Sequence, residues 1–185
     1  MTFAEVQEKT KNINALLSED DKAVLYNYAV QVPKDGVIVD IGTAAGGSSL
    51  IMTLASDPSV KVYTIDPRPN DNFVRDRKEW GLEDRITFYE KTSEDVAKEW
   101  DKGAIDLLFI DGIHSYWGVR ADLEGFGKFV KKGGLIIAHD CRLYGGIGEV
   151  LEEWVKNGFM DQVEIVESLY RDDPRVIGIF VGRKK

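Results

Sequence analysis

Five short apolar runs, each followed by a stretch of helical pattern, constrain the fold of this 185-residue chain more than any other feature. The runs lie at Val37–Ile41, Val60–Ile65, Ile86–Tyr89, Ile105–Ile110 and Leu135–Ala138. They show little polar alternation, as expected of strands that are covered on both faces. Regular alternation of strand and helix predicts a parallel sheet with right-handed crossovers, so we expect a doubly wound α/β fold.

The end of the chain departs from this alternation. Two more strand candidates, Gln162–Ser168 and Val176–Val181, are separated only by Leu169–Arg175. So short a link predicts an antiparallel hairpin, because parallel strands need a long crossover. We therefore expect a mostly parallel, seven-stranded sheet with a C-terminal antiparallel hairpin at one edge.

The length suits one domain, predicted over residues 1–185, with N-terminal helices in 1–32 and a Rossmann-like core in 33–185. The leading helices are expected at 3–17 and 19–31, divided by Ser18. 

Three further helices are expected between and after the strands. Thr92–Asp95 reads as a helix start, and Gly148–Asn157 as a late helix. Another helix is expected from near Ser115 to Gly133-Gly134. Its apolar positions are Val119, Leu123, Phe126 and Val130, and its predicted polar face holds Asp122, Glu124 and Lys131.

Composition excludes several classes of function. The single cysteine allows no intramolecular disulfide and no four-cysteine zinc site, which favours a reducing compartment. The net charge of −8 disfavours nucleic acid as a partner. The N-terminus lacks the apolar segment of a signal peptide, and no run is long enough to span a bilayer. We expect a cytoplasmic protein with no membrane partner.

The turn after the first strand has the pattern of a ligand-binding loop. Asp40 and Gly42 end the strand, and Gly46 and Ser48 lead into a helix. Open α/β sheets bind ligands at the carboxyl ends of their strands. Glycine allows a ligand to approach the backbone, and the first amides of a helix can hold a carboxylate.

Two common loop patterns do not fit this turn. The dinucleotide pattern G-x-G-x-x-G would need glycine at Ala44, and the P-loop pattern would need lysine after Gly47. The pattern that fits is D-x-G-x-x-x-G. A tight turn that binds nothing is the alternative.

Two polar positions follow the next strands. Asp66 ends the second strand, where a carboxylate could accept both hydroxyls of a ribose. Ser93 follows the third strand. A loop or helix-capping role is the alternative for Asp66, and an N-cap role is the alternative for Ser93.

Acidic and histidine side chains gather at the ends of the fourth and fifth strands. Asp111 and His114 follow one strand, and His139 and Asp140 follow the other. Adjacent strands would bring these groups to one edge, where clustered carboxylates repel unless a divalent cation compensates. His114 could also act as a proton acceptor near neutral pH, or could cap the next helix or bond to Asp111.

These motifs resemble those of a known family. The glycine loop resembles motif I of class I methyltransferases. The segments D-G-x-H-S-Y and G-G-x-I-x-x-H-D resemble small methyltransferases allied to catechol O-methyltransferase and antibiotic-sugar O-methyltransferases. The resemblance runs from about Gly36 to Cys141.

The resemblance implies roles for particular residues. S-adenosylmethionine would be bound by Asp40, Gly42, Thr43, Ala44, Gly46, Ser48, Asp66, Ser93 and Asp111. A divalent metal, Mg²⁺ or Mn²⁺, would be held by Asp111, His139 and Asp140. Catalysis would fall to Asp111 and to His114, where catechol O-methyltransferase has its lysine. His139 departs from the pattern, because the relatives have a carboxylate there and imidazole is a poor ligand for Mg²⁺.

We therefore expect S-adenosylmethionine-dependent methyl transfer to a small-molecule acceptor, with an oxygen as the methylated atom. The alternatives are metal-independent N- or C-methylation, a non-catalytic cofactor-binding module, and a nicotinamide oxidoreductase. Residues 1–20 and 142–160 are expected to shape the acceptor pocket, with Tyr116, Trp117 and Tyr144 as candidate walls or as core residues. An apolar N-terminal helix would suit a homodimer.

Overall fold

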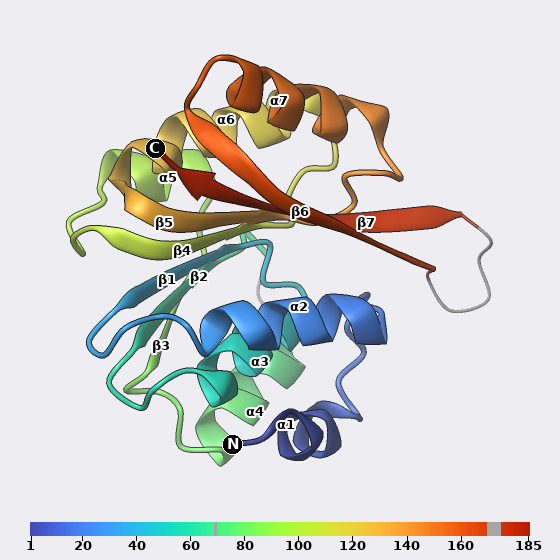
Figure 1. The fold of residues 1–185 in the computed structure, drawn as a ribbon. Coiled ribbons are helices and arrows are strands. Elements are labelled where there is room, and N and C mark those ends of the chain that lie inside the picture. Colours follow the sequence, from blue (N-terminus) through green and yellow to red (C-terminus); the bar gives the residue numbers. More distant parts are fainter. Residues whose placement is uncertain (69, 170–174) are drawn as a thin grey trace.

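A single mixed sheet forms the centre of the fold (Figure 1). The computed structural model describes residues 1–68, 70–169 and 175–185. Within them, seven strands follow the order β3-β2-β1-β4-β5-β7-β6. Their bounds are β1 Val37–Ile41, β2 Lys61–Ile65, β3 Ile86–Tyr89, β4 Ile105–Ile110, β5 Val130–Ala138, β6 Met160–Leu169 and β7 Val176–Lys184.

The pairing of the strands confirms the predicted fold class. β1 to β5 pair in parallel, while β7 runs antiparallel to both β5 and β6. The hairpin therefore lies at the edge beyond β5, as expected from the short link. Most of that link, residues 170–174, lies outside the described residues.

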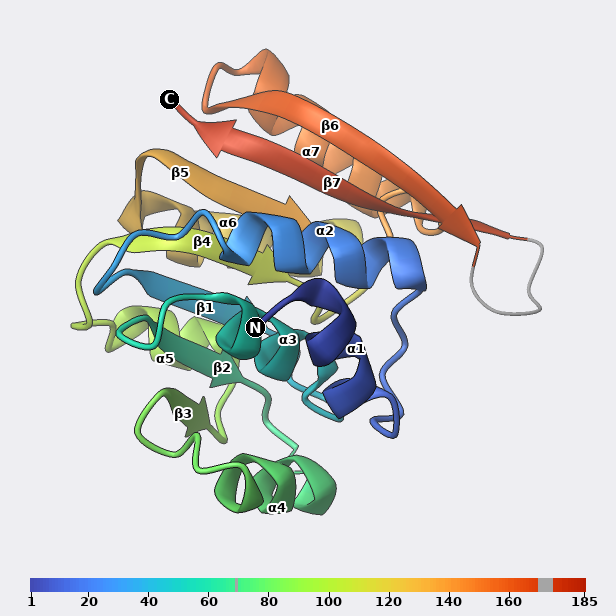
Figure 2. The ribbon, with the colours of Figure 1, turned by 60° about the horizontal axis from the view of Figure 1, so that its bottom comes forward.

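Helices cover both faces of the sheet (Figures 1 and 2). One face carries α1 Phe3–Thr10, α2 Glu19–Ala29, α3 Gly47–Ala55 and α4 Asp71–Glu79, and the other carries α5 Ser93–Lys98, α6 Tyr116–Phe126 and α7 Gly145–Lys156. Each layer buries its own apolar cluster against the strands. In the part of the chain that the structure describes, no helix has the length and apolar character needed to cross a membrane.

Backbone hydrogen bonds between neighbouring segments continue past the ends of the strands, and they hold the site residues in position. The amide of Gly42 donates to Ile65 O at 2.9 Å, and the amide of Asp111 donates to Ile41 O at 2.8 Å. The loops after β1 and β4 are thereby fixed at the carboxyl edge. The strand order reverses between β1 and β4, which is where doubly wound sheets open a crevice for ligands.

The first predicted helix is too long. Helix α1 ends at Thr10 instead of residue 17, and α2 ends at Ala29. Between them, Ile13, Ala15 and Leu17 are more buried than Asn14 and Leu16. This burial alternates with a period of two, so the segment runs without helix along the domain surface.

The helix expected from Ser115 to Gly133-Gly134 is also too long. Ser115 is the N-cap, which agrees with the predicted start near this residue, but α6 ends at Phe126. A short 3₁₀ turn over Gly127–Phe129 follows, and β5 begins at Val130. Glycine is a poor helix former, and a Cβ at Gly127 would lie 3.0 Å from the Phe159 ring. The late helix α7 begins at Gly145, three residues before its predicted start.

Gly46 provides a test of how the first turn is built. It has φ of +84°, and a Cβ there would lie 2.1 Å from the Phe73 ring. We expect Gly46→Ala to lower the free energy of unfolding by about 2–4 kcal/mol, from left-handed strain plus overpacking. Urea denaturation measures the change.

Gly145→Ala is the matched control, because it begins α7 and has no neighbour within 4 Å of its Cβ position. If both variants are equally stable, the turn does not need glycine at position 46.

Candidate active site

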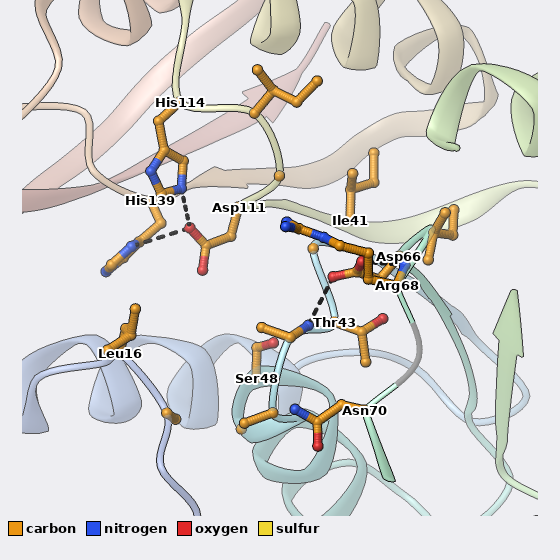
Figure 3. A pocket seen from close by; sticks show the side chains of 18 of the residues that line it. Leu16, Ile41, Thr43, Ser48, Asp66, Arg68, Asn70, Asp111, His114 and His139 are labelled. Carbon is orange, nitrogen blue, oxygen red and sulfur yellow. Dashed lines mark hydrogen bonds and ion pairs between the residues drawn. The ribbon is translucent and has the colours of Figure 1, made fainter. Parts of the chain in front are cut away.

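A cavity of about 610 Å³ opens at the carboxyl edge of the sheet (Figure 3). Its volume falls in the usual range for small-molecule sites. Most of the predicted site residues line it: Gly42, Thr43, Ala44, Ser48, Asp66, Ser93, Asp111, His114, His139 and Asp140. Asp40 and Gly46 are the two that do not.

Asp66 is held rigidly at the wall of this cavity. Its Oδ2 accepts a hydrogen bond from the Ala44 amide at 3.0 Å, and its Oδ1 accepts one from the Arg68 amide at 2.9 Å (Figure 3). Helix α4 is capped by Asn70, so Asp66 is not a helix cap. A carboxylate has about four acceptor positions, so this one can still accept hydrogen bonds from a ligand.

Asp40 lies beneath the turn instead of on the cavity wall. It is fully buried, and its Oδ2 accepts hydrogen bonds from the hydroxyls of Ser48, Ser49 and Thr64. Burial raises the pKa of Asp40 to about 7, although these hydrogen bonds oppose the change. Its Oδ1 is buried without a hydrogen-bond partner. In this position Asp40 ties the start of α3 to the end of β1.

Ser93 is not an N-cap. Thr92 caps α5, and the Ser93 hydroxyl instead donates to Asp122 Oδ1 at 2.6 Å. The prediction that Asp122 lies on a polar outer face is wrong, since it is 4% exposed and lines the cavity. The helical spacing could have predicted this burial. Position 122 is three residues after Val119 and four before Phe126, which puts it on their buried face.

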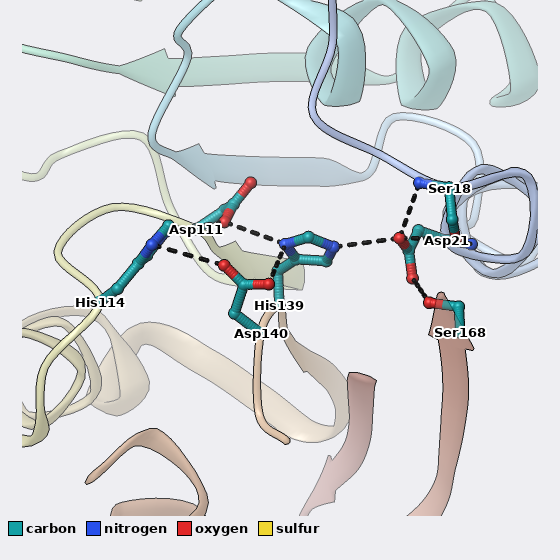
Figure 4. Close-up of polar contacts among 7 residues, drawn as sticks. All are labelled: Ser18, Asp21, Asp111, His114, His139, Asp140 and Ser168. Carbon is teal, nitrogen blue, oxygen red and sulfur yellow. Dashed lines mark hydrogen bonds and ion pairs between the residues drawn. The ribbon is translucent and has the colours of Figure 1, made fainter. Parts of the chain in front are cut away.

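The two histidines meet two carboxylates at the other end of the cavity (Figure 4). His114 Nε2 lies 3.3 Å from Asp111 Oδ1, and its Nδ1 lies 3.4 Å from Asp140 Oδ2. His139 Nδ1 lies 3.3 Å from the same Asp111 oxygen and 3.5 Å from Asp140 Oδ1. The predicted clustering of these four residues is confirmed. The predicted alternative that His114 caps a helix is wrong, because Ser115 is the cap.

Sequence reasoning missed a third carboxylate in this cluster. Asp21 of α2 is fully buried, and its Oδ2 lies 3.1 Å from His139 Nε2 (Figure 4). Its Oδ1 accepts a hydrogen bond from the Ser168 hydroxyl of β6 at 3.1 Å. The sequence signal for Asp21 is only that of a capping box with Ser18, which the structure also contains. Nothing in that local pattern points to a histidine 118 residues away.

The residues of this cluster shift one another's pKa values. Burial opposes ionisation of Asp111, but hydrogen bonds from His114 and His139 outweigh it and lower the Asp111 pKa. The hydrogen bond to Asp111 raises the pKa of His114. Burial would lower the pKa of His139, yet its bonds to Asp111 and Asp21 raise it far above the usual range. Burial raises the pKa of Asp140. The cluster therefore places acidic and basic groups with interdependent pKa values at this end of the cavity.

The same residues have the geometry of a metal site. Asp111, His139 and Asp140 can each offer one ligand atom, and these atoms lie within 4.8 Å of one another. Asp21 occupies Nε2 of His139, which leaves Nδ1 as the nitrogen facing the two carboxylates. Two oxygens and one imidazole suit Mn²⁺ or a neighbouring transition metal better than Mg²⁺.

The cavity differs in part from the predicted acceptor pocket. Residues 14–17 line it, which agrees with the prediction for 1–20, but no residue of 142–160 does. Tyr144 packs on His114 with ring centroids 5.1 Å apart. Tyr116 hydrogen bonds to Glu153, and Trp117 is 73% exposed. None of these three aromatic residues lines the cavity.

Comparison with known proteins identifies the family. A family model described as a methyltransferase domain matches residues 39–141, more than half of the chain. Dimethylglycine N-methyltransferase from Parasynechococcus marenigrum is 27% identical over 136 residues, covering 72% of this chain and 48% of that protein. Catechol O-methyltransferase from Sus scrofa is 26% identical over 96 residues, covering 49% of this chain and 52% of that protein. The chain thus spans about half the length of these curated relatives.

The fold has solved counterparts as well. The crystal structure of the O-methyltransferase TomG from Streptomyces achromogenes, in complex with S-adenosylmethionine, superposes with a TM-score of 0.78. It is 14% identical, and the match covers 99% of this chain and 89% of that one. This likeness confirms the Rossmann-like methyltransferase fold, and the family match excludes the nicotinamide alternative. The chain therefore belongs to the methyltransferase domain family, within the class I S-adenosylmethionine-dependent methyltransferases.

Proposed function

We propose that this chain transfers a methyl group from S-adenosylmethionine to an oxygen of a small-molecule acceptor. The observation that carries the proposal is that one cavity joins Asp66 to the cluster of Asp111, His114, His139 and Asp140. A nucleoside held at Asp66 would extend toward that cluster. Methyl transfer needs such an arrangement, because donor and acceptor must be aligned within one site.

The turn after β1 and Asp66 support the proposed binding of the cofactor. Gly42, Thr43, Ala44 and Ser48 would follow the methionine portion, while Asp66 would accept the ribose hydroxyls. Asp40 would act from beneath, by holding the turn in shape, and its partnerless Oδ1 would favour an ammonium group nearby. The cofactor supplies an activated methyl group, so the protein's tasks are to bind, orient and accept a proton.

The acceptor end has two candidate proton acceptors. Asp111 has a lowered pKa and borders the cavity, and His114 exchanges hydrogen bonds with it. Because the hydrogen bond to Asp111 raises the pKa of His114 and so favours its protonated form, we favour a shared role in which Asp111 receives the acceptor proton and His114 relays it to solvent. His114 is more exposed than its partners, which suits a relay.

We further propose that Asp111, His139 and Asp140 hold a divalent ion, with Mn²⁺ favoured over Mg²⁺. A bound ion at this place would lower the pKa of an acceptor hydroxyl. Asp21 would fix the His139 tautomer that leaves Nδ1 free, as carboxylates commonly do for metal-bound histidines. Metal-independent N- or C-methylation is the alternative, and its support is the similarity to an N-methyltransferase.

Calorimetric titration with S-adenosylmethionine and S-adenosylhomocysteine tests the cofactor site. We expect the wild type to bind both, and Asp66→Asn to bind about 10-fold more weakly or worse, because an amide has only one acceptor oxygen and lacks the charge that strengthens hydrogen bonds from the ribose hydroxyls. Asp71→Asn is the control, since Asp71 is exposed and outside the cavity. No heat with either nucleoside in the wild type would overturn the proposed function.

Removal of the Asp140 carboxylate tests the acceptor end. Asp140 has φ of +56°, which glycine adopts without strain, so Asp140→Gly deletes the charge cleanly. We expect at least a roughly 100-fold loss of activity with unchanged affinity for S-adenosylhomocysteine. The assay uses acceptors found by screening catechols, phenols and sugars. Asp35→Gly makes the same change at φ of +57° on an exposed turn and should keep full activity. An active Asp140→Gly enzyme would contradict this role.

Direct titration with Mn²⁺ tests the metal proposal. We expect tighter binding of Mn²⁺ than of Mg²⁺, and a roughly 10- to 100-fold loss of Mn²⁺ affinity in Asp21→Asn, because the His139 ring loses its orienting partner. Asp20→Asn is the control on the neighbouring, exposed position. A wild type that binds neither ion, and whose activity resists chelators, favours the metal-independent alternative.

A further inference from the structure

The proton chemistry proposed above leaves one buried carboxylate of the cavity without a role. Asp122 lies within α6, is 4% exposed and lines the cavity wall. Its Oδ1 accepts the hydrogen bond from Ser93. Among the described residues, no hydrogen bond to its Oδ2 is found, and no cation pairs with this carboxylate.

Such a group is costly to bury without a further donor. Burial raises the pKa of Asp122 to about 6, and the hydrogen bond from Ser93 opposes this change only in part. The side chain is therefore mostly an anion at pH 7, and its Oδ2 has no hydrogen-bond donor among the described residues. A carboxylate in this condition is stabilised by any ligand that donates an N–H or O–H to it.

The unsatisfied oxygen is accessible from the cavity. A Cβ at Gly112 would lie 3.7 Å from Asp122 Oδ2, so this oxygen lies beside a cavity-lining residue that has no side chain. Pro67 and Ile113 also line the cavity and offer apolar surface to a flat ring. Pro67 directly follows Asp66, the residue proposed to hold the ribose. The next group of the nucleoside beyond the ribose is the base.

We propose that Asp122 determines specificity for adenine, with its Oδ2 accepting a hydrogen bond from the exocyclic amino group of the base. Ser93 would hold the carboxylate in place through Oδ1. Adenine presents an amino donor at C6, whereas hypoxanthine and guanine present a carbonyl oxygen there. A carbonyl facing Asp122 would meet a second acceptor and be repelled. This inference deepens the proposed function and rests on its cofactor site.

The test compares two nucleosides that differ only at the C6–N1 edge of the base. S-adenosylhomocysteine carries an amino group at C6 and a bare N1, and S-inosylhomocysteine carries a carbonyl at C6 and a proton on N1. Calorimetry measures both affinities in the wild type, in Asp122→Asn and in Glu124→Gln. Glu124 is the matched control, because it lies two residues away on α6 and points to solvent with Arg120. Thermal unfolding without ligand checks that each variant is folded.

We expect the wild type to bind the inosine compound about 10- to 100-fold more weakly than the adenosine compound, the effect of losing one charged hydrogen bond. In Asp122→Asn the ratio should fall toward one, because an amide can accept from an amino group or donate to a carbonyl. Glu124→Gln should keep the wild-type ratio. If the role of Asp122 were purely structural, Asp122→Asn would lower the affinity for both compounds equally and leave the ratio of the two affinities unchanged.

Two outcomes would overturn the inference. One is equal affinity of the wild type for the two nucleosides, a measurement that needs no variant to fold. The other is an unchanged ratio in a folded Asp122→Asn protein. Either result would leave the cofactor site intact, whereas a wild type that binds neither nucleoside would remove both the cofactor site and this inference.

Discussion

The site depends on backbone hydrogen bonds that continue past the strands at the carboxyl edge of the sheet. Gly42 donates to Ile65 O, Asp111 to Ile41 O and His139 to Ile110 O, at 2.8–3.0 Å. These bonds tie each loop to the end of a neighbouring strand before the chain turns away. Functional groups on three separate loops are thus held in fixed positions relative to one another, and a small shift of one strand would misplace them.

A second constraint is the balance of charge among buried groups. Asp21, Asp111 and Asp140 would repel one another in a protein interior, and His139 lies between them as the compensating group. Because α2 supplies Asp21 and β6 supplies Ser168, the N-terminal helix and the C-terminal hairpin both contribute to this balance. The elements outside the matched methyltransferase segment, residues 39–141, are therefore part of the site's electrostatics.

Much of the fold could be predicted because its determinants are local. Apolar runs of strand length, short links and capping residues indicate strands, the hairpin and helix starts at Thr92 and Ser115. The helix ends were less predictable. Helix α6 stops where Gly127 meets the Phe159 ring, and residues 11–18 follow the surface of α3 through Ala15 and Gly47. Both endings depend on contacts with distant parts of the chain.

The sequence by itself determined the fold class, the family and the edge of the sheet at which the polar motifs gather, because strand topology places the carboxyl ends of parallel strands together. Only the tertiary structure decided what each polar group faces. It placed Asp40 under the turn, turned Asp122 into the cavity and brought Asp21 to His139. The physical reason is that a side chain's partners are set by packing between elements far apart in sequence, and a linear pattern does not record that packing.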